Sequence, residues 1–375
     1  MRLAVIMNLQ SPWARETVMH LVDHGCDVHV IDFDTLEASP GYLGSQYDKQ
    51  SRAIALLRKK VSGVHLLRSG RASELRYLLA ARQLRGVCES VRPDLLVTLY
   101  GGGSALMAWA SGFRPYVVYA VGSDVLLASG LRKRIARFVL DRARLVLANG
   151  KYLAERTRQL APRARVIAHY LGVDTRRFRP IDRPAESHVS GIVCTRGFLS
   201  VYNNDAIIRA LALIPESAGG YHMTFVSSGP LLPAARALAE QSVADDNRRK
   251  FEFLDGATAE RLLEIIQGAD IYVSMSRSDG TSSSLLEALA CGLFPIVSDI
   301  PANRDWVETS GRNGFLVPLD DDAALALALA TAISNPELRR SAAAHNRRMV
   351  QERADIENTT TLLIQHLERA AASYS

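Results

Sequence analysis

Short apolar runs and longer amphipathic stretches alternate along the chain. The first half carries apolar runs short enough to be buried strands at residues 2–7, 27–34, 94–100, 115–121 and 145–149. Between these runs, apolar residues return at the three- and four-residue spacing of a helix. The same alternation continues from residue 191 onward. Strands that alternate with helices predict parallel sheets covered on both faces, so we expect an α/β protein.

The most informative stretch runs from residue 271 to residue 299. An apolar run at 271–275 predicts a buried strand, and a loop rich in hydroxyl side chains leads into a helix with an apolar face. Gly292 is placed to end that helix, and 294–297 predicts the next strand. The loop offers backbone N–H groups and a helix N-terminus, which suit a phosphate or another anion.

Two carboxylates, Asp279 and Glu287, bracket this loop. One lies on the loop and the other in the first part of the helix, so they can reach different parts of one ligand. A sugar nucleotide needs such a site, with donors for its phosphates and acceptors for its hydroxyls. Ser284 and Glu287 also have the spacing of a helix capping box, in which Glu287 would be structural. The spacing alone leaves both roles open.

The composition is that of a globular protein with two domains. The chain has 375 residues, more than a typical single domain, of which 48% are apolar and 22% charged. Residues 1–7 are too short for a secretory signal, and the longest uncharged stretch, 95–113, contains three consecutive glycines that argue against a membrane span. The four widely spaced cysteines predict reduced thiols in a cytosolic protein, not a disulfide framework or a zinc site.

Basic residues are concentrated in the first half. Residues 1–180 contain 28 Lys and Arg against 14 Asp and Glu, whereas the remaining residues contain 17 against 25. Most of the excess lies between residues 51 and 180, with 25 basic and 7 acidic residues. This asymmetry predicts an anionic partner for the first half. The basic helices predicted within 52–92 are either solvated faces or a surface for anionic lipid headgroups.

The chain begins like a nucleotide-binding domain but lacks the usual glycine fingerprint. No G-x-G-x-x-G follows the first strand, and the connecting loop is predicted at residues 8–16. Asp32 and Asp34 imitate a metal-binding D-x-D pair. Because acidic residues commonly end the second strand of such domains, we do not assign this pair to a metal.

The segment Asp279-Gly280-x6-Glu287 resembles the E-x7-E signature of retaining, GT-B-fold glycosyltransferases of family 4, the nucleotide-sugar-dependent group 1 glycosyltransferases. Asp279 stands where that family usually has Glu. The resemblance extends over nearly the whole chain and is strongest between Arg196 and Pro318.

The resemblance implies two Rossmann-like domains that face each other across a cleft. An acceptor domain is expected at 1–180, completed by a C-terminal helix at 356–375. A nucleotide-sugar donor domain is expected at 181–355, and the polar stretch 180–190 would link the two.

In the first half, the Gly-Ser-Asp sequence at 122–124 resembles a turn of the family's first domain, with Val121 in place of the usual His or Arg. Trp13 and Ala14 stand where the family has a Gly-Gly pair, so Trp13 would narrow the space beside the donor phosphate. The glycines at 101–103 either approach a phosphate or make a tight turn. The residues expected on the acceptor side are Trp13, Gly101, Gly102, Gly122, Ser123 and Asp124.

In the second half, the segment from Thr195 to Tyr202 corresponds to the family's G-R-L-x3-K-G motif. Arg196 is retained, and its guanidinium would pair with the donor diphosphate. The lysine is absent and Tyr202 stands near its place, which leaves Arg196 with more of the phosphate charge. The loop at 255–260 would frame the base. The residues expected to bind the donor are Arg196, Gly197, Tyr202, Ala257, Thr258, Asp279, Gly280, Thr281, Ser282, Ser283, Ser284, Leu285 and Glu287.

By this resemblance, the chain transfers a sugar from a nucleoside diphosphate sugar with retention at the anomeric carbon, and without a metal or another cofactor. Arg196 and the loop N–H groups at 281–284 would stabilise the leaving diphosphate. Glu287 would hold the ribose hydroxyls, and Asp279 would hold a hydroxyl of the sugar. These three side chains are the expected catalytic residues.

The expected partners are a nucleotide sugar and a lipid-linked or oligosaccharide acceptor of surface polysaccharide or glycolipid assembly, with no nucleic acid. The basic first half favours an anionic membrane surface, so we expect a cytoplasmic protein held peripherally at the inner membrane face. Two alternatives are a soluble transferase that acts on a small molecule and a non-catalytic basic binder on a GT-B scaffold.

Overall fold

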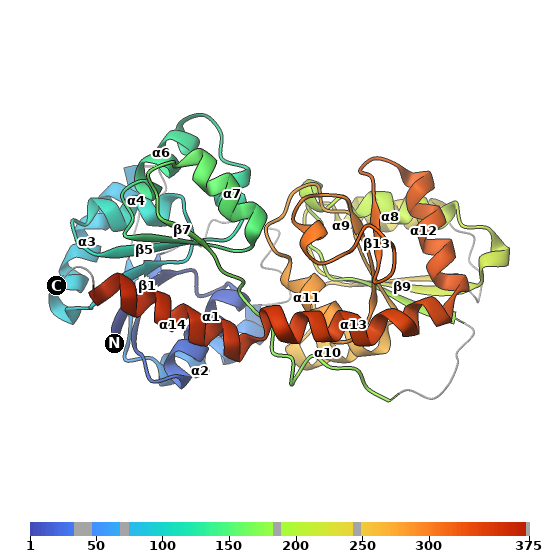
Figure 1. The fold of residues 1–375 in the computed structure, drawn as a ribbon, viewed down its shortest axis with the longest axis horizontal. Helices are drawn as coiled ribbons and strands as arrows, with labels where there is room; N and C mark the ends of the chain where they lie inside the picture. Colours follow the sequence, from blue (N-terminus) through green and yellow to red (C-terminus); the bar gives the residue numbers. More distant parts are fainter. Residues whose placement is uncertain (34–46, 68–74, 183–188, 243–248, 373–375) are drawn as a thin grey trace. The chain divides into compact units, whose positions relative to one another are not determined.

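The computed structural model describes residues 1–33, 47–67, 75–182, 189–242 and 249–372. These residues form two compact units (Figure 1). The first holds most residues up to Leu171 together with the C-terminal helix from Ile356, and the second holds Gly172–Asp355.

A sheet of seven parallel strands forms the centre of the first unit. The strand order is β3-β2-β1-β4-β5-β6-β7, so the direction of winding reverses between β1 and β4. Loops at the carboxyl ends of the strands beside such a reversal are the usual ligand site of an open α/β sheet. The strands are β1 (Arg2–Met7), β2 (Asp27–Phe33), β3 (Gly63–Leu67), β4 (Leu95–Thr98), β5 (Tyr116–Ala120), β6 (Leu145–Ala148) and β7 (Val166–Ala168).

Helices cover both faces of this sheet. Buried residues of α1, α2 and α14 pack on one face, and those of α3, α4, α6 and α7 pack on the other. The helices are α1 (Pro12–Asp23), α2 (Tyr47–Lys60), α3 (Leu75–Val91), α4 (Gly103–Ala110), α5 (Ser123–Leu126), α6 (Gly130–Leu140), α7 (Lys151–Leu160) and α14 (Ile356–Ala372).

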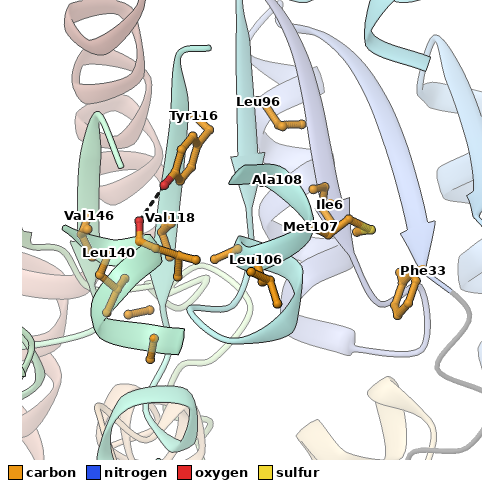
Figure 2. Close-up of a cluster of buried hydrophobic side chains, with 14 of the residues drawn as sticks. Ile6, Phe33, Leu96, Leu106, Met107, Ala108, Tyr116, Val118, Leu140 and Val146 are labelled. Carbon is orange, nitrogen blue, oxygen red and sulfur yellow. Dashed lines mark hydrogen bonds between the residues drawn. The ribbon is translucent and has the colours of Figure 1, made fainter. Parts of the chain in front are cut away.

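The alternation of side chains along each strand supplies both cores. Leu3 and Val5 of β1 pack in the cluster with α1, whereas Ala4 packs in the opposite cluster, part of which is drawn in Figure 2. Tyr116 is fully buried there, and its hydroxyl donates a 2.6 Å hydrogen bond to the carbonyl of Val139. The buried phenol is therefore satisfied within the core.

The C-terminal helix α14 is part of the first unit. Leu363 and Leu367 lie in the same buried cluster as residues of α1, and Glu357 lies 3.4 Å from the imidazole of His24. The preceding helix α13 belongs to the second unit, so the chain passes from one unit to the other between Asp355 and Ile356.

A sheet of six parallel strands forms the centre of the second unit. Its order is β10-β9-β8-β11-β12-β13, so the winding reverses between β8 and β11. The strands are β8 (Val189–Cys194), β9 (Gly220–Val226), β10 (Arg249–Leu254), β11 (Ile271–Ser274), β12 (Phe294–Ser298) and β13 (Phe315–Val317).

Helices α8, α9 and α12 cover one face of this sheet, and α10, α11 and α13 cover the other (Figure 1). They are α8 (Asn204–Ala212), α9 (Leu232–Ser242), α10 (Ala259–Gly268), α11 (Ser283–Ala290), α12 (Asp322–Ser334) and α13 (Pro336–Ala354), with short 3₁₀ turns at Ser200–Tyr202, Glu216–Ala218 and Asn303–Asp305.

Helix α11 ends at the predicted glycine. Gly292 has a φ of 80°, and its N–H donates to the carbonyl of Leu289 at 3.0 Å. The N–H of Leu293 donates to the carbonyl of Ala288 at 3.0 Å, which completes a Schellman motif. The predicted strand, helix and strand from residue 271 to residue 298 are thus present.

Helix α1 begins earlier than the sequence predicted. Trp13, expected in the loop after the first strand, lies in the first turn of α1. Pro12 occupies the first helical position, where its fixed φ is compatible with the helix and its missing N–H leaves no bond unmade.

The division between the units also differs from the expected boundary. It follows Leu171, nine residues before the expected end of the first domain at 180. Residues after it pack within the second unit, where Arg347 donates to the carbonyls of Thr175 and Phe178 at 3.1 Å each. Of the expected linker at 180–190, residues 183–188 lie outside the described residues, and Val189 already begins β8.

Candidate active site

The two expected phosphate and sugar ligands, Arg196 and Asp279, lie at the reversal of the second sheet. Arg196 follows β8 and Asp279 follows β11, and these two strands are neighbours. Because both strands are parallel, their carboxyl ends bring the two loops to the same edge of the sheet. The fold thereby unites residues that are 83 positions apart in the sequence.

Arg196 and Asp279 form a salt bridge at this edge. The Nη2 atom of Arg196 is 2.7 Å from Oδ2 of Asp279, and its Nη1 donates to Oγ of Ser282 at 2.9 Å. The two charged side chains are only 11% and 19% exposed, so the pair is largely removed from water. The sequence assigned the partners to different parts of a donor, whereas the structure joins them to each other.

Burial and charge pairing act in opposite directions on this pair. Burial lowers the pKa of Arg196, but the Asp279 carboxylate and nearby tyrosines raise it by more, so the pKa lies above its ordinary value. Burial raises the pKa of Asp279, and Arg196 and the N–H of Gly280 offset only part of that rise. Each charge therefore stabilises the ionised form of the other in a site that favours neutral groups.

Tyr202, which stands near the place of the family's lysine, covers the guanidinium of Arg196. The Cζ atom of Arg196 lies 4.1 Å from the centroid of the Tyr202 ring, which is a cation–π contact. The guanidinium of Arg196 is thus held between the carboxylate of Asp279 and the aromatic ring of Tyr202.

Asn204 holds the Arg196 loop in place, a role that the sequence analysis missed. It is 3% exposed, and its Nδ2 donates to the carbonyls of Arg196 at 3.3 Å and Gly197 at 3.1 Å. The thiol of Cys194 donates to Oδ1 of Asn204 at 3.7 Å, and burial raises the pKa of that thiol to about 11. An Asn at the start of a helix is the only sequence signal for this contact, and it usually indicates a cap.

Ser282 caps helix α11, and the capping box that the spacing of Ser284 and Glu287 left open is absent. The hydroxyl of Ser282 accepts from the N–H of Leu285 at 3.3 Å, so Leu285 is the third helical residue. Glu287 lies two residues further along and does not occupy the position from which a capping box reaches back. The capping interpretation of Glu287 is therefore wrong.

The other predicted donor residues take two positions. Gly280, Thr281 and the serines that follow lie in the loop and first turn of α11, beside the salt bridge. Ala257 and Thr258 follow the edge strand β10, with β9 between that strand and β8. The hydroxyl of Thr258 accepts from the N–H of Arg261 at 3.1 Å and so caps α10.

Asp124 ties together two loops at the carboxyl edge of the first sheet. Its Oδ1 accepts from the N–H of Gly122 at 2.8 Å and from that of Val121 at 3.2 Å, and its Oδ2 accepts from the N–H of Gly101 at 2.5 Å. Burial raises the pKa of Asp124, and these N–H groups offset part of the rise. The carboxylate is thus occupied by backbone donors and shapes the loops, while the adjacent Ser123 is exposed.

Trp13 and Tyr100 meet at the reversal of the first sheet. Trp13 lies in the helix after β1 and Tyr100 follows β4, and their rings pack edge to face with centroids 5.6 Å apart. In the glycine run beyond Tyr100, Gly102 is the N-cap of α4, and a Cβ atom at Gly103 would overlap the ring of Tyr77. Close packing accounts for Gly103, whereas a Cβ atom at Gly102 would meet no described atom within 4 Å.

Clusters of three or more metal-binding side chains and membrane-spanning helices are both absent from the described residues. The part of the chain that the structure describes contains no group of three or more His, Cys, Asp and Glu side chains placed to hold a metal ion. Asp32 accepts from the N–H of Leu9 at 3.2 Å, and Asp34 lies outside the described residues. Within those same ranges, none of the helices is long and apolar enough to cross a membrane.

One family model matches each of the two units. Residues 12–177 match the model described as Glycosyltransferase Family 4, and residues 192–349 match the model described as Glycosyl transferases group 1. The chain belongs to the group 1 glycosyltransferases.

Among curated relatives of this group 1 glycosyltransferase, the putative glycosyltransferase EpsD of Bacillus subtilis is 28% identical over 50% of this chain and 53% of its own length. The GDP-mannose:cellobiosyl-diphosphopolyprenol alpha-mannosyltransferase of Xanthomonas oryzae pv. oryzae is 33% identical over 23% of this chain and 21% of its own. The chain therefore aligns with about half of the first relative and less of the second.

Solved structures show the fold. Sucrose-phosphate synthase from Thermosynechococcus elongatus superimposes with a TM-score of 0.79 at 18% identity and covers 100% of both chains. Anabaena HepE in complex with UDP gives 0.75 at 17% identity and covers 98% of this chain and 100% of its own. The predicted GT-B fold, with two Rossmann-like α/β units, is confirmed.

We expect the Arg196–Asp279 pair to control the stability of the second unit. Arg196→Gln and Asp279→Asn each leave one buried charge without its partner, so each should lower the free energy of unfolding by about 3 kcal/mol at neutral pH. The double variant leaves neither charge and should recover part of the loss. Urea unfolding of the four proteins gives the coupling free energy directly, and strictly additive losses would show that the pair is not coupled.

The same variants give a matched pH test. In Arg196→Gln the pKa of Asp279 rises further above its unfolded value, so folding favours the protonated carboxyl. That variant's stability should then be highest below about pH 4 and fall as pH rises toward the folded pKa. The loss in free energy of unfolding relative to wild type should be small at low pH and should reach about 3 kcal/mol at neutral pH. The double variant Arg196→Gln/Asp279→Asn should lack this pH dependence.

Proposed function

We propose that this group 1 glycosyltransferase moves a sugar from a nucleoside diphosphate sugar to a lipid-linked or saccharide acceptor of surface polysaccharide or glycolipid assembly, with retention at the anomeric carbon. The relatives support the reaction class: one is a putative glycosyltransferase, and another is a mannosyltransferase that acts on a diphosphopolyprenol-linked sugar. HepE, which shares the fold, has been crystallised with UDP.

The observation that carries the proposal is the position of Arg196 beside the N-terminus of α11. Its guanidinium is bonded to Ser282, the residue that caps this helix. A cation and the positive end of a helix thus lie at one edge of the sheet, and both attract a diphosphate. With the diphosphate there, we assign the ribose hydroxyls to Glu287 and a sugar hydroxyl to Asp279. The Asp279 side chain reaches about 1.5 Å less far than a Glu.

In the proposed reaction, the bond between the anomeric carbon and the diphosphate oxygen breaks while the acceptor hydroxyl attacks on the same face. The departing diphosphate takes the proton of that hydroxyl, so we assign no protein base, metal ion or other cofactor. Arg196 and the N–H groups at the start of α11 stabilise the negative charge that develops on the diphosphate. The salt bridge to Asp279 holds the guanidinium in place before the substrate binds, which limits the reorganisation needed in the transition state.

A panel of nucleotide sugars tests the function. A donor at 100 times its dissociation constant should stabilise the wild-type protein by about 2.7 kcal/mol in a thermal-shift assay. Arg196→Gln, assayed below its own melting temperature by calorimetry, should bind the matching nucleoside diphosphate more weakly by about 2 kcal/mol, because a charged hydrogen-bond donor is lost. If none of the nucleotide sugars stabilises the wild-type protein, the result favours the non-catalytic binder instead.

Glu287→Gln separates ribose binding from a structural role. Since Ser282 caps α11, this variant should melt close to the wild type. Its turnover should fall by about ten- to a hundredfold, the range expected when a charged acceptor of hydroxyl hydrogen bonds becomes neutral. Glu264→Gln is the matched control, because this glutamate is exposed on α10 and outside the proposed site, and the variant should keep both stability and turnover. Full activity of Glu287→Gln would exclude the ribose role.

A basic cavity in the first unit supports an anionic, lipid-linked acceptor. It has a volume of about 490 Å³ and lies between α6 and α7, with Lys133, Arg134, Arg137 and Arg156 in its lining and no carboxylate. Apolar residues, among them Leu126 of α5 and Leu160 of α7, and the amide of Gln159 complete the lining. Cations above apolar groups suit a phosphate headgroup, so we place the protein at the cytoplasmic membrane face as a peripheral protein.

Vesicle co-sedimentation tests this attachment. Wild-type protein should bind vesicles containing phosphatidylglycerol at low salt, release at high salt, and ignore neutral vesicles. Lys133→Gln/Arg134→Gln should weaken binding about thirtyfold, because each basic residue near an anionic surface contributes about 1 kcal/mol. Arg82→Gln/Arg85→Gln on α3 removes the same charge elsewhere and should bind as the wild type. Equal losses of vesicle affinity in both double variants would mean that the net charge of the protein, and not the cavity, attracts the membrane. A wild-type protein with no preference for anionic vesicles would favour a small-molecule acceptor.

A further inference from the structure

Two histidines meet on one face of the first sheet, away from the loops that the proposed function uses. His29 lies on β2 and His65 on β3, the outermost strand in the sheet order. His29 pairs with Gly63, and His65 follows two residues later, so both imidazoles project from the same face. Nδ1 of His29 is 3.4 Å from Nε2 of His65, and the ring centroids are 5.6 Å apart.

The row of side chains that contains His29 changes from apolar to polar at this point. Ile31 and Phe33 continue the row toward the end of β2 and are buried in the core, at 0% and 4% exposure. An apolar residue in place of His29 would extend that core. Burial, together with His29, lowers the pKa of His65. Its ring is therefore neutral at neutral pH, and the neutral imidazole is the form that a metal ion binds.

The separation of the two nitrogens is that of two ligands of one tetrahedral metal ion. Zn²⁺ binds imidazole nitrogens at about 2.1 Å, which places two such ligands about 3.4 Å apart. A hydrogen bond between the rings is the alternative, but its usual donor–acceptor distance is about 2.7–3.2 Å. The observed 3.4 Å therefore fits a shared metal ion better than a shared proton.

Gly63 keeps the space beside the two nitrogens open. A Cβ atom on Gly63 would lie 3.0 Å from Nδ1 of His29 and 3.3 Å from Nε2 of His65. Any other residue would place a carbon atom beside the gap between these nitrogens. With glycine, the space is available to the water ligands that complete the coordination of an ion with two protein ligands.

Asp27 is placed to orient a metal-bound His29. Its Oδ1 lies 3.6 Å from Nε2 of His29 and is buried without a hydrogen-bond partner among the described residues. Its Oδ2 pairs with Nε of Arg2 at 2.6 Å. A metal ion on Nδ1 of His29 fixes the ring proton on Nε2, which then faces Oδ1. Carboxylates commonly hold metal-bound imidazoles in this way.

We propose that His29 and His65 bind one divalent transition-metal ion, with Zn²⁺ as the best match, and that Asp27 orients His29. Two protein ligands make this an open site, different in kind from the clusters of three or more ligands that the described residues lack. The ion ties the outermost strand β3 to β2 and so stabilises the first unit. Its role is structural, and the proposal does not depend on the function proposed above.

Isothermal titration calorimetry of the whole chain, without a histidine tag and stripped of metals by a chelator, tests the site. One equivalent of ZnCl₂ should bind to the wild type, whereas MgCl₂ should not, because Mg²⁺ prefers oxygen ligands. In His65→Gln the dissociation constant for Zn²⁺ should rise at least tenfold. Zinc should also raise the melting temperature of the wild type and slow hydrogen exchange of residues 61–67, and should do neither in His65→Gln.

Gly63→Ala tests the geometry while keeping both imidazoles. The added methyl group fills the space beside the nitrogens, so the dissociation constant for Zn²⁺ should again rise at least tenfold. A melting curve in chelator shows that each variant is folded before zinc is added. If folded Gly63→Ala binds zinc as tightly as the wild type, the proposed arrangement of ligands is wrong.

His20→Gln/His24→Gln is the matched control. These two histidines lie one turn apart at the C-terminal end of α1, with ring centroids 6.5 Å apart, and are another neighbouring pair that could bind zinc. The variant should keep the wild-type affinity, because Nδ1 of His24 already lies 2.8 Å from the carbonyl oxygen of His20. Loss of zinc binding in this variant, with binding retained in His65→Gln, would overturn the proposal. A wild-type protein that zinc neither binds nor stabilises would overturn it as well.

Discussion

One salt bridge, between Arg196 and Asp279, organises the carboxyl edge of the second sheet. The two residues come from the loops after β8 and β11, and their burial means that neither charge is stable there alone. Ser282 binds the same guanidinium, Tyr202 stacks on it and Asn204 holds its backbone. A loop, a helix cap and an aromatic ring thus all contact the same arginine. We therefore expect a substitution at one of them to change the positions of the others.

Patterns within one element were sufficient to predict five of the seven strands of the first sheet and the end of α11 at Gly292. They missed β7, and β3 lies within the stretch 52–92 that was predicted to be helical. They were insufficient where two residues satisfy the same rule. Ser282 and Ser284 both have a serine's propensity to cap a helix, and only the backbone path decides between them. The family resemblance placed Asp124 in a turn but gave no sign that backbone N–H groups occupy its carboxylate.

Contacts between segments far apart in the chain could not be predicted from the sequence patterns. Arg196 and Asp279 are far apart along the chain, and their pairing depends on β8 and β11 being neighbours. The burial of Arg15 in α1, which is 8% exposed, was equally unpredictable. An arginine in an amphipathic helix is usually solvated, and its burial depends on what the fold packs around it. In both cases, the sequence did not predict how far a charged side chain is removed from water, because the tertiary structure determines its local dielectric environment.

The discontinuity of the first unit has a consequence for biosynthesis. Its sheet is complete in sequence by Ala168, yet one face of that sheet is covered in part by Leu363, Leu367 and Ala370 of α14. Ribosomes make the chain from its N-terminus, so the part of that face that α14 covers stays exposed while the whole second unit is synthesised. The unit whose synthesis begins first is therefore the last to complete its core, because the final apolar side chains of that core are the last to be made.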